Sequence, residues 1–377
     1  MEQNLQGGGK NPLKKLGNKW STFMEDTRTR WHGFLRLSPR EKGKRALGWL
    51  GDNALYLLIL AFVLGVFFYN SSFLSFGSIV NILMQSASRL LMALGVAGII
   101  VLTGTDLSAG RCLGLCACIC ASLLQANGVA NKMFSRLTFS PALILLALLV
   151  SLLVGGAVGA FNGFMVSRFK LHPFIVTLGT QLILYGAVMW YVSLGQNNSA
   201  PIAGLAPAYT RLVTGGFRIL GVQIPNYLWI VLGVTVLMWV VWNKTVLGKN
   251  MFAVGTNPEA AAVCGVNVSR TIVTVFFLAG LLYGASAFVE CARVASNSTA
   301  TGVNYELDAI AACVIGGVSF MGGIGKISGV VLGVFLLQLV NAGLVFLNFE
   351  PAVMTVVKGA IILIACAIDM RKYIAKR

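Results

Sequence analysis

Residues 142–166 read ALILLALLVSLLVGGAVGAFNGFMV and carry no charged side chain. About 20 mostly apolar residues are enough for a helix to cross the hydrocarbon core of a bilayer. This stretch therefore predicts a membrane-spanning helix. Nine further apolar runs lie at 53–70, 79–103, 107–126, 173–194, 227–243, 271–292, 306–321, 327–348 and 352–370.

The composition of the 377 residues agrees with this pattern. Hydrophobic residues make up 57% of the chain and charged residues 11%, against about 25% charged in ordinary soluble proteins. We therefore expect an all-α polytopic membrane protein with about ten transmembrane helices. Short polar or glycine-rich segments at 103–106 and 321–325 separate two pairs of runs, which predicts interrupted helices near the substrate path.

Basic residues outnumber acidic residues by 29 to 12, as on a nucleic-acid surface or in the cytoplasmic loops of a membrane protein. The apolar runs favour the second interpretation, so no nucleic-acid partner is expected. Residues 1–50 should be a cytoplasmic basic tail, either an interfacial helix or a disordered arm, and 51–377 the membrane domain. Ten crossings also place the C-terminus in the cytoplasm. Four basic residues count against this orientation: Lys132, Arg136, Arg211 and Arg218.

Three patterns suggest chemistry that the rest of the sequence does not support. The GGIGK segment at 322–326 lacks the first glycine and the Ser/Thr of a phosphate loop. Gly155, Gly156, Gly159 and Gly163 resemble a dinucleotide fingerprint but lie in an apolar run, where small residues let helices approach closely. The cysteines between 112 and 120 have no histidine nearby, which favours packing over metal binding. No hydrolase triad is recognisable. We expect a transport subunit, not an enzyme, with no cofactor or metal of its own.

Ionisable residues within the apolar runs are Arg89, Asp106, Glu290, Glu306, Asp308 and Lys358. Such groups are costly in a membrane and mark functional or structurally paired positions. Arg89 and Asp106 could compensate each other, and Glu306 and Asp308 could simply favour a helix N-terminus. The functional interpretation is a polar lining that hydrogen-bonds a neutral sugar. Its candidate residues are Thr105, Asp106, Asn162, Thr177, Gln181, Glu306, Asp308 and Asn341.

The expected cytoplasmic loop at 244–270 contains a complete short helix. Asn257 is its N-cap, Pro258 its first residue, and Glu259 favours its N-terminal end. Ala260 and Ala261 extend it, and Gly265 is a suitable stop. A two-turn helix of alanines is either a plain connection or a docking element for a partner ATPase.

Four segments resemble the permeases of bacterial sugar ABC importers of the ribose/galactose/xylose class. The first, GTNPEAAAVCG at 255–265, resembles their coupling loop and adds Gly255 to the coupling residues. The others are GTDLSAG at 104–110, NG at 162–163 followed by PFIVTLGT at 173–180, and YELDAI at 305–310 running into VIGGVSFMGGIG at 314–325. The resemblance covers about residues 50–377. The segments 101–110 and 314–323 also resemble each other, which suggests matching elements along the pathway.

The resemblance implies a multi-pass protein of the bacterial inner membrane that works with a second copy of itself. Its other partners would be a cytoplasmic ATPase with tandem nucleotide-binding halves, which would use the ATP and Mg, and a periplasmic sugar-binding protein. The long basic tail departs from the family. Within this class, the resembling segments are most similar to the galactose/methylgalactoside permeases. Glucose, ribose, xylose or another small sugar stays open as substrate, and an ion-coupled secondary transporter is the less favoured alternative.

Overall fold

The computed structural model describes residues 41, 43, 54–130, 132–195, 197–219 and 221–374. The chain divides into two compact units, residues 1–57 and 58–377, and nearly all described residues belong to the second. The basic tail expected at 1–50, with its interfacial helix or disordered arm, lies outside the described residues except for Glu41 and Gly43.

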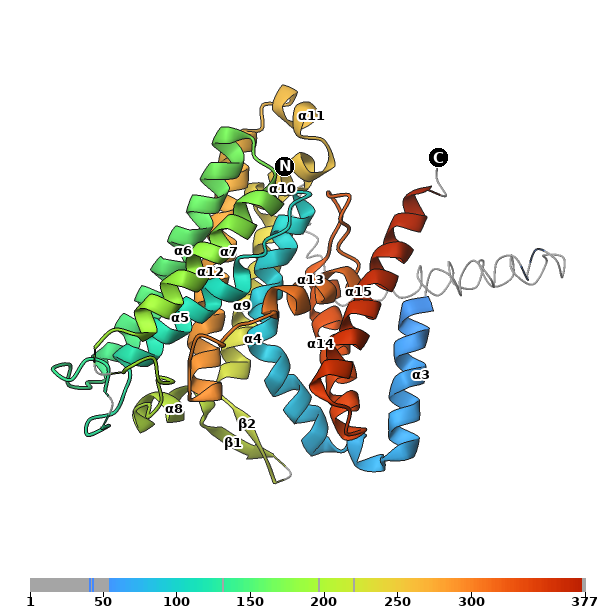
Figure 1. Ribbon diagram of the computed structural model, residues 1–377. Helices are drawn as coiled ribbons and strands as arrows, with labels where there is room; N and C mark the ends of the chain where they lie inside the picture. Colours follow the sequence, from blue (N-terminus) through green and yellow to red (C-terminus); the bar gives the residue numbers. More distant parts are fainter. Residues whose placement is uncertain are drawn as a thin grey trace, which may run out of the picture. The chain divides into compact units, whose positions relative to one another are not determined.

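Helices make up most of the described chain (Figure 1). They are α3 (Ala54–Tyr69), α4 (Phe76–Val101), α5 (Ala109–Leu123), α6 (Ala142–Phe169), α7 (Pro173–Val192), α8 (Pro207–Thr214), α9 (Tyr227–Lys244), α10 (Val246–Thr256), α11 (Pro258–Val263), α12 (Val268–Val294), α13 (Tyr305–Ile315), α14 (Ile327–Phe346) and α15 (Pro351–Ile374). A 3-10 turn, η1 (Ser71–Leu74), precedes α4. Strands β1 (Gly216–Ile219) and β2 (Val222–Pro225) form an antiparallel hairpin in which Phe217 pairs with Ile224. The all-α class is confirmed.

Each of the ten apolar runs contains one helix, but the helices differ in length. Seven helices of the described residues are long and apolar enough to cross a membrane: α4, α6, α7, α9, α12, α14 and α15. Helices α3 and α5 are apolar but shorter. The eighth run, 306–321, forms only the 11-residue α13, because the chain turns at Gly317, whose φ of +79° suits glycine.

The two expected interruptions are present. Between α4 and α5 the chain leaves the helical conformation over residues 102–108, where Thr103 has a φ of +62°. Between α13 and α14 it does so over 316–326, where Gly322 and Gly323 have φ of +78° and +66°. Positive φ ends a right-handed helix.

Helices α6 and α12 pack with their backbones almost in contact. A Cβ atom added at Gly155 would meet the carbonyl oxygen of Gly280, and one added at Gly159 would meet that of Phe276. The predicted packing role of these α6 glycines is confirmed, since small residues allow such an approach. This pair forms the centre of the fold on which α4 and α5 also pack.

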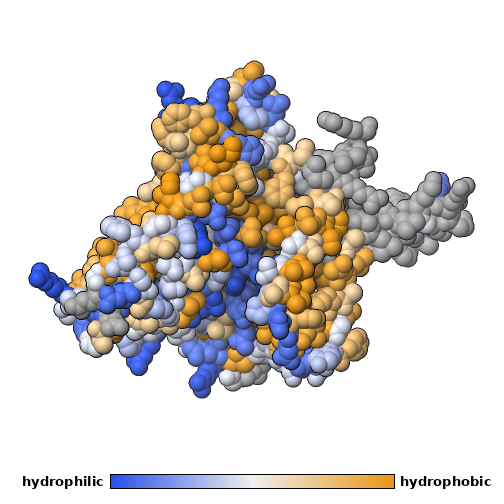
Figure 2. Space-filling model, viewed as in Figure 1, coloured by the Kyte–Doolittle hydropathy of each residue, from blue (hydrophilic) through white to orange (hydrophobic). Residues whose placement is uncertain are grey.

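The second unit has two distinct ends (Figure 1). Helices α10 and α11 lie at one end, together with the C-terminal end of α15, and α8 with the β1–β2 hairpin lies at the other. Between them, large apolar side chains are exposed on α6, α7, α9 and α15, among them Leu153, Leu182, Leu237 and Leu363. Such a surface fits the hydrocarbon core of a bilayer. Figure 2 shows hydrophilic residues gathered between apolar flanks in the middle of one face.

Candidate functional site

The first interruption is held by a buried network around Asp106. Asp106 Oδ1 accepts hydrogen bonds from the backbone nitrogen (2.9 Å) and the hydroxyl (2.6 Å) of Ser108. Tyr283 on α12 donates its hydroxyl proton to Asp106 Oδ2 at 3.0 Å. A buried carboxylate needs such donors. The network therefore ties the loop between α4 and α5 to α12.

The same network reaches α6 and α7. Asn162 donates from Nδ2 to the Ser108 hydroxyl (2.9 Å) and accepts from the Thr180 hydroxyl (2.6 Å). The Thr177 hydroxyl donates to the carbonyl of Thr105 at 3.2 Å. The structure thus brings together four predicted residues: Thr105, Asp106, Asn162 and Thr177. Asp106, Asn162 and Thr177 are buried in this conformation, so their contact with a sugar stays a prediction.

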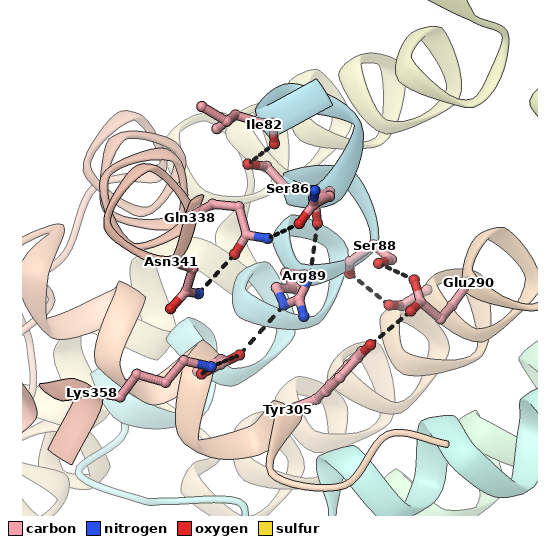
Figure 3. A network of polar contacts seen from close by, with 12 residues as sticks. Ile82, Ser86, Ser88, Arg89, Glu290, Tyr305, Gln338, Asn341 and Lys358 are labelled. Atoms are coloured by element: carbon pink, nitrogen blue, oxygen red, sulfur yellow. Dashed lines mark hydrogen bonds and ion pairs between the residues drawn. The ribbon is translucent and has the colours of Figure 1, made fainter. Parts of the chain in front are cut away.

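Asp308 is the centre of a second network, of which Figure 3 labels Arg89, Tyr305 and Lys358. Its carboxylate lies 3.0 Å from Lys358 Nζ on α15 and 3.4 Å from Arg89 Nε on α4. The Arg89 guanidinium also lies 4.7 Å from the centre of the Tyr305 ring. Compensation of Arg89 by Asp106 was therefore wrong. The half-helix α13 brings Asp308 to the middle of α4, a proximity that spacing along the chain does not reveal.

Asn341, another predicted residue, joins this region through a chain of side-chain amides. It donates to Gln338 Oε1 at 3.0 Å, and Gln338 donates to Gln85 Oε1 at 3.1 Å. Arg89 in turn donates to the carbonyl of Gln85 at 3.1 Å. These groups line a cavity of about 410 Å³ between α4, α14 and α15. Asp308 and Asn341 therefore belong to one polar region.

Glu290 forms an ion pair that Tyr305 connects to the second network. Arg293 donates to both of its oxygens, at 2.8 and 2.5 Å. Ser88 and Tyr305 also donate their hydroxyl protons to it, at 2.5 and 2.8 Å. Glu290 is fully buried and has four donor contacts, which fits the structural pairing expected for an intramembrane charge.

Two predicted residues join neither network. Glu306 is buried at the start of α13, close to the backbone of Gly110, and its Oε2 has no hydrogen-bond partner among the described residues. Gln181 is partly exposed on α7, and no described hydrogen bond links it to the networks. A pathway role for either stays a prediction.

The short helix in the loop between α9 and α12 is confirmed as α11. Asn257 accepts a hydrogen bond from the nitrogen of Ala260 at 2.9 Å, Pro258 is the first residue, and Glu259 lies in the first turn. Gly265, with φ of +83°, follows the helix end. Of its residues only Ala261 is buried, whereas the side chain of Val263 is 89% exposed. Helix α11 therefore presents a small, largely apolar surface.

The preceding helix, α10, was not predicted, and it connects α11 to both interruptions. A Cβ atom at Gly255 would collide with the carbonyl oxygen of Val101 and approach the nitrogen of Gly323. Those two groups are themselves hydrogen-bonded, Gly323 N donating to Val101 O at 2.9 Å. A Cβ at Gly322 would approach the carbonyl of Gly255. The two segments that resemble each other in sequence thus meet at the end of α10.

The four cysteines between 112 and 120 lie inside the fold. Cys112, Cys116, Cys118 and Cys120 are free and buried, as expected for packing residues. No group of three His, Cys, Asp or Glu side chains that could hold a metal occurs among the described residues.

Sequence reasoning missed several residues of the two networks: Ser108, Thr180 and Tyr283 in the first, and Gln85 and Gln338 in the second. A partial signal was present. Gln85 and Arg89 are four residues apart, and Gln338 and Asn341 three apart, spacings that place polar side chains on one face of a helix.

Known proteins resemble this chain over most of its length. The sequence matches the family described as branched-chain amino acid transport system / permease component over residues 78–366. The galactose/methyl galactoside import permease protein MglC of Salmonella typhimurium (strain LT2) is 40% identical over 335 residues, which cover 89% of this chain and 98% of that protein. The MglC protein of Haemophilus influenzae is 40% identical over 343 residues, 90% and 100% of the two chains. The ribose import permease protein RbsC of Bacillus subtilis (strain 168) is 34% identical over 316 residues, 84% and 91% of the two chains. No solved structure matches the chain.

Proposed function

The chain belongs to the family of transport-system permease components, and we propose from this that it is the membrane subunit of an ATP-driven importer of galactose and methyl galactosides. The family description names branched-chain amino acids, but the relatives that align over nearly the whole chain at 40% identity are sugar permeases. Ribose is the second candidate substrate, supported by the lower identity of 34% to a ribose permease.

The surface of α11 is the observation that supports ATP hydrolysis by a partner as the energy source. Helix α11 is too short to cross a membrane, its residues other than Ala261 are exposed, and α10 connects it to both interruptions. Small exposed side chains let another protein approach closely. A cytoplasmic ATPase with tandem nucleotide-binding halves docks there, hydrolyses ATP with Mg, and moves α10. The permease contributes no nucleotide site.

The remaining partners follow from the same proposal. A second copy of the permease completes the pathway, and a periplasmic sugar-binding protein delivers the sugar at the end formed by α8 and the hairpin. The protein lies in the bacterial inner membrane with both termini in the cytoplasm. Seven basic residues support this orientation. Arg168 and Lys170 lie at the end of α6, Lys244 ends α9, Lys249 lies in α10, Arg270 lies at the start of α12, and Arg371 and Lys372 lie near the end of α15. Figure 1 shows α10, α11 and the C-terminal end of α15 at the same end of the second unit.

Transport proceeds by changes in backbone geometry at the interruptions. When α10 moves, the loops at 102–108 and 316–326 move with it, because Gly255 is in backbone contact with both. These loops connect to the Asp106 network and to α13, which carries Asp308. Binding inside the permease is weak, since a tight site would retain the sugar, and selectivity rests with the binding protein.

Co-purification followed by reconstitution tests this function. The permease should purify with a tandem ATPase whose hydrolysis rises when a galactose-loaded binding protein is added to the vesicles. Stimulation by ribose-loaded binding protein alone would favour the second candidate. Uptake by the isolated permease that follows an ion gradient would contradict the proposal and favour a secondary transporter.

A further inference from the structure

The cavity between α4, α14 and α15 reaches from one end of the second unit to its middle. Ser78, Phe346 and Pro351 line its outer part and lie at the start of α4, the end of α14 and the start of α15. Figure 1 shows these helix ends on the side opposite α11. Arg89 and Lys358 line its inner part. Ser78 and Arg89 are separated by about 16 Å along α4 at 1.5 Å per residue, roughly half of a 30 Å hydrocarbon core.

The polar lining consists mainly of uncharged groups. Four residues with amide side chains, Asn81, Gln85, Gln338 and Asn341, line the cavity together with Thr355. An amide offers both donors and acceptors, as a sugar hydroxyl does. The Oδ1 atom of Asn341 is buried and accepts no hydrogen bond from the described residues. This oxygen therefore needs a donor that the described side chains do not supply.

The charged groups at the inner end share one carboxylate. Both Arg89 and Lys358 lie within 3.4 Å of the Asp308 carboxylate, so the cluster holds its charges together and keeps one net positive charge. Figure 3 shows Arg89, Gln338, Asn341 and Lys358 converging on one region from three helices. The inner end of the cavity is thus an ion-paired cluster at the start of α13. Helix α13 is a half-helix of the kind that surrounds transporter sites.

We propose that this cavity is the outer half of the sugar pathway and binds a neutral monosaccharide transiently through Gln85, Gln338 and Asn341. The Arg89–Asp308–Lys358 cluster closes its inner end. This inference rests on the proposed function, because it assigns to a defined cavity the sugar that the importer moves. A volume of about 410 Å³ leaves room for either a hexose or its methyl glycoside.

The test measures galactose uptake and ATP hydrolysis by the complete complex of permease, ATPase and binding protein in vesicles. The variants Asn341→Leu and Gln85→Leu should lower uptake about fivefold each, the effect of losing a hydrogen bond to the passing sugar. Stimulation of the ATPase by the loaded binding protein should stay within about twofold of wild type. Asn341→Ser, which keeps a donor and an acceptor, should restore part of the uptake.

A matched threonine pair provides the control. The hydroxyls of Thr355, in the cavity, and Thr274, on α12, each donate to the carbonyl four residues earlier, at 3.0 and 2.8 Å. Thr355→Val should lower uptake and Thr274→Val should not. Wild-type uptake by Asn341→Leu and Gln85→Leu would overturn the assignment, and so would equal loss of uptake and ATPase stimulation in assembled complexes. A wild-type complex without sugar-dependent ATPase stimulation would instead refute the proposed function itself.

Discussion

At the scale of single residues, Asp106 accepts three of the hydrogen bonds that hold the first interruption. It accepts from Ser108 twice and from Tyr283, and Ser108 accepts in turn from Asn162. All four residues are buried. Removing the carboxylate leaves buried donors without an acceptor, which costs more than the net contribution of the bonds themselves.

Asp106→Ala should therefore lower the free energy of unfolding by about 2–4 kcal/mol. The measurement is thermal unfolding of the purified permease in detergent. Glu350→Ala is the control, because Glu350 is exposed in the turn before α15 and a surface change should stay within about 0.5 kcal/mol. Equal melting of the Asp106→Ala and wild-type proteins would show that the network contributes nothing to stability.

The residue scale is also where sequence reasoning reached its limit. Asp106, Asn162 and Thr177 were selected as polar groups in apolar runs, and the structure joins them in one network. The partner of Arg89 was wrong, because the nearest acid in sequence is Asp106 whereas the acid beside it in space is Asp308. Side-chain polarity predicts that a buried group needs a partner, but only the arrangement of helices decides which.

At the scale of elements, apolar length predicted a helix in each of the ten runs, and seven helices of the described residues are long and apolar enough to cross a membrane. A helix suits such a run because it satisfies its own backbone hydrogen bonds. Apolar length failed at α13 and α10. The second half of the run at 306–321 is apolar apart from Ser319, yet the glycines at 316 and 317 end the helix. Helix α10 has no capping pattern as clear as that of α11, and its position depends on the backbone contact at Gly255.

The pair α6 and α12 gives a direct test of close packing. Gly159→Ala places a methyl group against the carbonyl of Phe276, so we expect a loss of about 1–3 kcal/mol in stability from overpacking. Gly179→Ala on α7 is the matched control, since an added Cβ there meets nothing within 4 Å. Thermal unfolding of both variants measures this difference in stability. A Gly159→Ala protein as stable as the Gly179→Ala protein would contradict the close approach.

The contact between α10 and the two interruptions predicts a defect in coupling. Gly255→Ala forces the backbone of α10 away from Val101 and Gly323, while α11 keeps its capped structure. We expect sugar uptake in reconstituted vesicles to fall about tenfold, the effect of raising the activation free energy of transport by about 1.4 kcal/mol. ATP hydrolysis should be less affected. Gly233→Ala on α9 adds a Cβ in open space and should transport normally. Parallel loss of uptake and hydrolysis would argue against a mechanical link.

At the scale of the whole molecule, the Asp106 network and the cavity beside the Asp308 cluster are both connected to α11 through packed segments. The exposed helix α11 follows α10, and α10 contacts both interruptions. The first interruption contains Asp106, and the second follows α13, which carries Asp308 at the inner end of the cavity. Contiguous packing of this kind predicts that movement of α11 reaches the polar groups in the middle of the membrane domain.

Val263 tests whether a partner docks on α11, because its side chain is 89% exposed and plays no part in the packing of the permease. Val263→Glu should leave insertion, elution volume and thermal stability unchanged, since exposed substitutions change stability by about 0.5 kcal/mol or less. It should remove the co-purified ATPase, because a carboxylate would be buried without a partner in the docking surface. Val263→Ala, which stays apolar, should retain the ATPase with modestly weaker binding. An ATPase that stays bound to the Val263→Glu protein at wild-type levels would place the docking surface elsewhere and leave α11 a simple connection.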